Sequence, residues 1–362
     1  MKKIIITAVL ILSVLIVGIL FISRRQDKTE GLKVGVLLNG EKTDQSWSQS
    51  HYAGMEATAE ELGLDVTYYE NVPETEKCMD YIKTLIAEGC DIIICNSFNF
   101  GSYALQAAEE HPEICFFHAS GVETAKNLST YFGRMYQMRY LSGIVAGLQT
   151  ETNQIGYVAA FPISEVNRGI NAFTLGVRSV NPDAVVYVEW CNSWTDDKAA
   201  ANATRTLLLN YDIDVLAMHT DSLRPLEIAE EESIWSIGYN TDNSRKCDDT
   251  FLTAPVWNWE NFYIPRIKEC QQGKFEGRKY WEGAESGMVA LAPLTEHVKA
   301  GISQVVEQKM QEISNGTFDV FYGPIYDRNE VLRIPAEESM SDEAMLNEFD
   351  WYVKGVIIHG EK

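Results

Sequence analysis

Short apolar segments alternate with amphipathic ones from residue 32 to about residue 238. The apolar segments are rich in Val, Ile and Leu, which is typical of strands buried on both faces. The amphipathic segments have helical spacing, and the one at 50–62 ends at Gly63, a common helix stop. Strands are expected at 32–38, 66–69, 91–95, 114–118, 155–159, 184–189, 215–219 and 234–238, with helices between them. This alternation predicts parallel sheets with right-handed crossovers.

The strands fall into two series, which predicts two α/β lobes. Links rich in small and polar residues occur near 127–130, 252–256 and 286–288, so the chain is expected to cross between lobes more than once and to form a hinge there. The predicted first lobe comprises 32–128 and 257–285, and the second comprises 129–254 and 286–362. Ligands bind beyond the carboxyl ends of parallel strands, so two facing sheets predict one cleft lined by the loops after the strands.

An uncharged, apolar run at residues 4–22 precedes the lobes. It has about the length that a helix needs to cross a bilayer, and no small-residue cleavage site such as A-x-A follows it. The first 31 residues are therefore expected to be a retained signal anchor with a linker. The basic residues on the two sides nearly balance, so they do not set the orientation.

Composition narrows the classes of partner. The chain of 362 residues is 46% hydrophobic and 23% charged, enough for two ordinary cores. Its formal charge of −22 would repel a nucleic-acid backbone, so no nucleic-acid partner is expected. The seven cysteines lack metal-ligand spacing, and most lie in apolar runs where a free thiol behaves as a small hydrophobe. Cys247 and Cys270 have polar neighbours, where a bridge is conceivable.

The loops after the strands carry aromatic and polar side chains. Trp47 stands in a polar loop at a helix start, which suits stacking on a planar ligand, although packing between loop and helix is the alternative. Ser97 and Phe98 follow the third strand, and Trp194 follows a strand of the second series. Glu165 either faces a helix dipole or accepts a hydrogen bond from a ligand amine.

No catalytic motif accompanies these residues. The sequence has no G-x-S-x-G elbow, no H-E-x-x-H, no P-loop and no dinucleotide glycine motif after a strand. A nucleoside hydrolase would need D-x-D-like metal ligands after a strand, and none is found. Reversible binding is therefore favoured over turnover, and no metal or other cofactor is expected.

Several segments together resemble the basic membrane protein family of substrate-binding proteins of ABC transporters. The resemblance extends over about 33–356 and is carried by 44–47 (DQSW), 157–173, 176–182, 194–196 (WTD), 238–242 (GYNTD) and 287–293. It implies a type I periplasmic-binding-protein fold, with two doubly wound parallel-sheet lobes and a hinge. It also implies a monomer outside the cell membrane, held by the N-terminal helix in place of the usual lipid-modified cysteine, that serves an ABC permease.

The resemblance also implies a ligand. Known members bind purine nucleosides, and the positions that stack on the base and hold ribose hydroxyls correspond to Trp47 and Asp242. A lysine of the nucleoside-binding members is replaced by Trp257, so the resemblance favours a purine base, adenine-like, held between Trp47 and either Trp194 or Trp257. A nucleoside-binding protein and a sensor feeding a separate signalling partner are the alternatives. The predicted ligand-binding residues are Asp44, Trp47, Ser97, Phe98, Glu165, Trp194, Thr220, Asp221, Asn240, Asp242 and Trp257.

Overall fold

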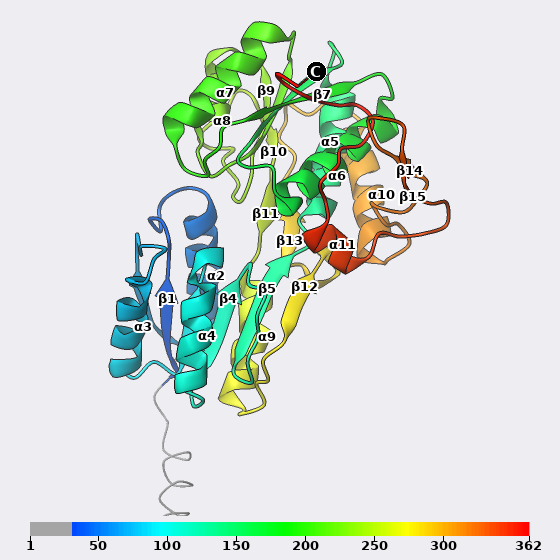
Figure 1. Ribbon diagram of the computed structural model, residues 1–362. Coiled ribbons are helices and arrows are strands. Elements are labelled where there is room, and N and C mark those ends of the chain that lie inside the picture. Colours follow the sequence, from blue (N-terminus) through cyan, green and yellow to red (C-terminus); the bar gives the residue numbers. More distant parts are fainter. Residues whose placement is uncertain (1–30, 362) are drawn as a thin grey trace, which may run out of the picture.

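A computed structural model describes residues 31–361, which form two α/β lobes joined by crossing segments (Figure 1). The membrane anchor predicted at residues 4–22 lies outside the described part of the chain. Between residues 31 and 361, none of the helices combines the length and the apolar character that a bilayer span requires.

The first lobe is built on a six-stranded sheet whose strands are all parallel. In spatial order the strands are β12 (Lys279–Glu282), β5 (Leu128–Gly133), β4 (Cys115–Ala119), β3 (Ile92–Cys95), β1 (Lys33–Leu37) and β2 (Asp65–Tyr69). Its helices are α2 (Trp47–Leu62), α3 (Cys78–Ala87), η1 (Phe98–Phe100), α4 (Gly101–Glu110) and α9 (Glu260–Gln271). All residues of β3 are buried, as its unbroken apolar run predicts for a strand covered on both faces.

The second lobe repeats this design with a second parallel six-stranded sheet. Its strands, in spatial order, are β10 (Phe251–Thr253), β9 (Trp235–Ile237), β8 (Val215–His219), β6 (Gln154–Ala159), β7 (Val185–Trp190) and β16 (Val356–Ile358). Its helices are α5 (Tyr136–Gln149), α6 (Ser164–Val180), α7 (Asp197–Asn210), α8 (Arg224–Glu231), α10 (Ile302–Ser314) and α11 (Asp342–Asn347). A short hairpin of β14 (Ile325–Tyr326) and β15 (Leu332–Ile334) lies at its edge.

Two short strands connect the lobes. β11 (Pro255–Trp257) pairs antiparallel with β13 (Val289–Leu291), which follows the turn η2 (Ala284–Ser286), and Figure 1 shows this pair between the two large sheets. The link predicted at 127–130 is wrong. Most of it belongs to β5, which pairs with β4 and β12, so the first crossing follows Gly133 and not residue 128. Small polar side chains are typical of an exposed link, but here Ser129 and Thr130 are buried in the sheet.

Helices α5 and α6 pack closely in the second lobe. A Cβ atom at Gly143 would lie 2.1 Å from the backbone oxygen of Phe173, and one at Gly176 would lie 2.0 Å from that of Tyr140. Such separations are far below van der Waals contact, so only glycine allows the two backbones to approach this closely. The backbones of α5 and α6 are therefore in direct contact at these two glycines.

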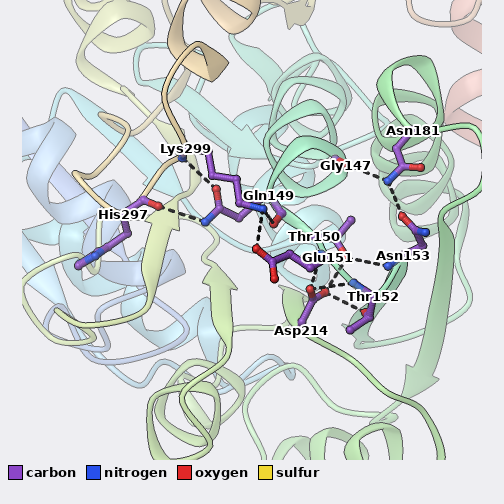
Figure 2. A network of polar contacts seen from close by, with 10 residues as sticks. All are labelled: Gly147, Gln149, Thr150, Glu151, Thr152, Asn153, Asn181, Asp214, His297 and Lys299. Atoms are coloured by element: carbon purple, nitrogen blue, oxygen red, sulfur yellow. Dashed lines mark hydrogen bonds and ion pairs between the residues drawn. The ribbon is translucent and has the colours of Figure 1, made fainter.

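A polar network fixes the far end of α5 (Figure 2). The carboxylate of Asp214, just before β8, accepts hydrogen bonds from Thr150 Oγ1 at 2.6 Å, from the backbone N of Glu151 at 2.5 Å, and from the backbone N and Oγ1 of Thr152, both at 3.1 Å. Lys299 Nζ donates to the backbone oxygen of Gln149 at 2.8 Å. The network ties α5 to β8 and to the segment before α10 at the amino edge of the sheet, away from the cleft.

Candidate ligand-binding site

The loops at the carboxyl ends of the two sheets contact each other. The backbone oxygen of Gln45, after β1, accepts hydrogen bonds from Thr241 Oγ1 at 2.5 Å and from Asn243 Nδ2 at 3.2 Å, both after β9. Ser46 Oγ of the same loop donates to Asp221 Oδ1, after β8, at 3.3 Å. The two lobes therefore meet at the edges where ligands of parallel sheets bind.

Asn240 connects three segments at this contact. Its Nδ2 donates to Ser46 Oγ of the first lobe at 2.9 Å and to Asp221 Oδ1 of the second at 2.7 Å. Its Oδ1 accepts a hydrogen bond from Trp257 Nε1 of the connecting strand β11 at 2.8 Å. Asn240 is 1% exposed and has a φ of 68°, a left-handed conformation that asparagine tolerates better than most residues. The Asn240 side chain therefore links both lobes to the connecting strand β11.

Asp221 is an unusual carboxylate in this network. Its enclosure and the neighbouring charge of Asp44 raise its pKa to about 7, although the hydrogen bonds from Ser46 and Asn240 act in the opposite direction. The group therefore changes its protonation near neutral pH. Such a residue can accept hydrogen bonds from a ligand when ionised and donate one when protonated.

An aromatic cluster lies beside the polar contact. The ring of Trp47 meets those of Trp257, Trp259 and His51 edge to face, with centroids 5.8, 5.7 and 4.5 Å away. Trp257 stacks on Trp259 at 4.4 Å with an interplanar angle of 8°. Trp47 Nε1 donates to the backbone oxygen of Asn96 at 2.9 Å, which fixes the indole plane. Trp257 and Trp259 are buried, whereas Trp47 remains partly exposed, so Trp47 is the indole of this group that a ligand can reach.

A second set of rings lies on the second lobe around His219. The ring of Trp194 is 6.0 Å from that of Phe161 and 6.1 Å from that of His219. Tyr157 Oη lies 3.2 Å from His219 Nδ1, and Glu165 Oε1 lies 3.7 Å from His219 Nε2. The latter distance is too long for a hydrogen bond. Both oxygens of Glu165 therefore retain the capacity to accept from a ligand.

Burial and nearby charges together set the protonation of His219 and Glu165. Burial lowers the pKa of His219 to about 4, and the positive charge of Arg139 adds to the effect, so its imidazole is neutral at pH 7. Burial would raise the pKa of Glu165, but the polar contact with the ring N–H of His219 and the positive charges of Arg168 and Arg139 outweigh it and lower the pKa below its ordinary value. Glu165 is therefore a carboxylate at neutral pH, with 28% of its side chain exposed.

The structure brings some of the predicted residues together. Trp47, Asp221, Asn240 and Trp257 form one cluster, while Glu165 and Trp194 lie around His219. Thr220 supports this second set, because its Oγ1 donates to the backbone oxygen of Trp194 at 2.6 Å.

Other predicted residues have local roles. The carboxylate of Asp44 accepts from the backbone N of Ser48 and Gln49 at 2.9 Å and so fixes the start of α2. Ser97 Oγ donates to Glu74.

Two predicted residues lie at the surface. Phe98 is 57% exposed. Asp242 is also exposed, and its Oδ1 accepts from the backbone N of Ser244 at 2.9 Å. Neither joins the two clusters, so their part in ligand binding stays a prediction.

Three residues outside the predicted set belong to the site. Ser46 joins the lobes, His219 anchors the second ring set, and Asn96 holds Trp47. The Asn96 side chain is fully buried, and its Nδ2 has no hydrogen-bond partner among residues 31–361. Buried amide donors are rarely left unpaired, so Asn96 is a candidate donor to a ligand. The signal that could have identified these three residues is their position: His219 ends β8, Asn96 directly follows β3 and Ser46 directly precedes α2.

No metal-binding group accompanies these clusters. The described residues contain no set of three or more His, Cys, Asp or Glu side chains placed to hold a metal ion.

Comparison with known proteins identifies the family of this chain and several relatives. Residues 32–321 match a family described as PnrA-like ABC transporter substrate-binding proteins. A purine-binding protein of Brucella abortus is 33% identical over 329 residues, which cover 90% of this chain and 93% of the relative. A protein of Haloferax volcanii described as an ABC transporter glucose-binding protein is 34% identical, over 86% of this chain and 77% of the relative.

A solved structure shares the fold. An ABC transporter solute-binding protein from Conexibacter woesei superposes with a TM-score of 0.70 at 18% identity, over 80% of this chain and 98% of that protein. The likeness confirms the predicted α/β architecture with parallel sheets.

Proposed function

The chain belongs to the PnrA-like family of ABC transporter substrate-binding proteins, and on this premise we propose that it binds an adenine-like purine base between its lobes for import. Proteins of this family bind small molecules and deliver them to ABC permeases, so the chain is a binding protein and not an enzyme. One observation carries the choice of ligand. The partly exposed indole of Trp47 stands beside Asp221 and Asn240, where the two lobes meet.

This arrangement suits a flat heterocycle with polar edges. A purine ring stacked on Trp47 gains dispersion and π contact, and aromatic stacking of a base is worth about 1–3 kcal/mol. The carboxylates of Asp221 and Glu165 can accept from ring N–H or amino groups, and Asn96 Nδ2 can donate to a ring nitrogen. Closure of the lobes would remove water from these groups, so a ligand that fails to pair them is rejected.

The same geometry favours a base over a nucleoside. Trp257 replaces the lysine expected in nucleoside-binding members, is 6% exposed, and has its Nε1 engaged by Asn240. It offers no ammonium group to ribose hydroxyls. Asp242, the other residue implied in ribose binding, is exposed and occupied with the backbone N of Ser244. Both observations support a ligand without a sugar.

The cellular setting is part of the proposal. The apolar run at residues 4–22 would hold the protein at the cell membrane, with both lobes on the extracytoplasmic side and acting as a monomer. Protease treatment of intact cells should remove the lobes and leave the N-terminal segment with the membrane. Protection of the lobes would contradict this placement.

Titration calorimetry of the purified protein tests the ligand. We expect adenine to bind more tightly than adenosine, and glucose, the ligand in the name of the Haloferax volcanii relative, to give no heat. Trp47→Ala should weaken adenine binding by about 1–3 kcal/mol. Tyr322→Ala is the matched control, because Tyr322 is an aromatic that is 52% exposed and belongs to neither cluster. Tight glucose binding without adenine binding would refute the proposal.

A further inference from the structure

Two of the seven cysteines differ from the rest in their surroundings. Five are buried, namely Cys78, Cys90, Cys95, Cys191 and Cys247. Cys115 and Cys270 are only half-buried and pack against the same hydrophobic cluster, and the raised pKa of Cys270 reflects the proximity of the Cys115 thiol. The bridge conceivable from the sequence between Cys247 and Cys270 is absent, because all seven thiols are free and Cys270 faces a different cysteine.

The packing of α9 on the first sheet explains this pairing. Cys115 and Phe117 lie on the same face of β4, since side chains alternate along a strand. Phe117 packs against Phe262 of α9, with ring centroids 5.9 Å apart. Cys270 follows Phe262 by about two helical turns and so shares its face of α9. The two cysteines therefore lie where α9 packs on β4.

We propose that Cys115 and Cys270 are a thiol pair that forms a disulfide when the folded protein meets a small-molecule disulfide. One thiolate attacks the small disulfide, forms a mixed disulfide and releases one small thiol. The second cysteine then attacks the sulfur of the first, forms the Sγ–Sγ bond and releases the second small thiol. The protein loses two hydrogens and the small disulfide is reduced, so atoms and electrons balance.

The bond would join two segments of the lobe that are far apart in sequence. Cys115 belongs to the first pass of the chain through this lobe, and Cys270 belongs to its return after the second lobe. A bridge across so long a loop restricts the unfolded chain and stabilises the folded one. Cys115 begins β4, whereas the ligand cleft lies at the carboxyl ends of the strands, so the bond should leave ligand binding unchanged.

The rate of bond formation should depend on pH. Burial, together with the hydrogen bond and charge of Cys115, raises the pKa of Cys270 above its ordinary value, so little thiolate is present at pH 7. Whichever cysteine reacts first, Cys270 must act as the attacking thiolate in one of the two steps. Formation should therefore speed up as pH rises from 7 to 9.

Incubating the native full-length protein with oxidised glutathione tests the proposal. Peptide mapping without reductant should find Cys115 linked to Cys270, with the other five thiols free. The melting temperature should rise by about 4 °C or more and return when reductant is added. Cys115→Ser should abolish both changes, whereas Cys247→Ser, the matched control at a buried thiol, should retain them.

Two results would overturn the proposal. One is a Cys270 link to Cys247, and the other is a native protein whose Cys115 and Cys270 stay as free thiols or as stable glutathione adducts at pH 9. Neither readout depends on ligand binding, so this test and the test of the purine proposal fail independently.

Discussion

Replacing Asn240 by alanine tests two roles of this side chain, its contact between the lobes and its local packing. The side chain makes three hydrogen bonds, with Ser46 Oγ, Asp221 Oδ1 and Trp257 Nε1, and only the one to Ser46 joins the two lobes directly. The alanine variant should therefore disturb closure through one bond and the local packing through the other two.

The magnitude follows from these contacts. A net protein hydrogen bond contributes about 0.5–1.5 kcal/mol, so loss of the bond to Ser46 should weaken closure on a ligand by about 1 kcal/mol, or roughly fivefold in affinity. The indole N–H of buried Trp257 is also left without its partner, and a buried unpaired donor costs about 1–3 kcal/mol. That second cost should appear as a lower melting temperature even without ligand.

Calorimetric titration with adenine and differential scanning calorimetry measure the two effects. Arg245→Ala is the matched control, since Arg245 lies in the same loop but is exposed and belongs to neither cluster. Its adenine affinity should change by no more than about twofold, as for most surface substitutions. An Asn240→Ala protein with wild-type affinity, or an Arg245→Ala protein with an equal loss, would show that the role assigned to Asn240 is wrong.

Three further substitutions test other parts of the structure. Asp221 has a pKa raised to about 7, so the folded protein holds this proton more tightly than the unfolded chain does and should lose stability as pH rises from about 4 to about 7. Asp221→Asn should flatten that part of a profile of melting temperature against pH. An unchanged slope would contradict the assignment. Glu165→Gln should weaken adenine binding by about 1.5–3 kcal/mol in calorimetry if the carboxylate accepts from the amino group, with equal affinity as the opposing result. Asp214→Ala removes a carboxylate that accepts four hydrogen bonds (Figure 2). The free energy of unfolding, measured in urea, should fall by about 2 kcal/mol, while adenine affinity stays the same. A loss of affinity without a loss of stability would be inconsistent with a purely structural role.

The sequence was sufficient for the repeating architecture. Apolar runs and helical periodicity are local properties, so the strands at β1, β3 and β8 and the stop of α2 at Gly63, which has a φ of 66°, follow from neighbouring residues. The N-cap of α7 is equally local, because the carboxylate of Asp196 accepts from the backbone N of Lys198 and Ala199. Patterns of this kind need no knowledge of distant segments.

Contacts between distant segments could not be predicted from the sequence. The strand β5 begins among small polar residues that are typical of a link, and only its pairing with β4 and β12 makes it part of the first sheet. Asn240 and Asp242 stand two positions apart in one loop, and nothing local distinguishes the buried amide from the exposed carboxylate.

The amino-acid sequence by itself therefore determined two parallel α/β lobes with aromatic and polar residues after the strands, because strand, helix and loop signals act over a few residues. Only the tertiary structure decided which of those residues meet. It placed Trp257 behind Trp47, Asn240 between the lobes and Cys115 against Cys270, because each contact depends on how the chain returns after crossing between lobes.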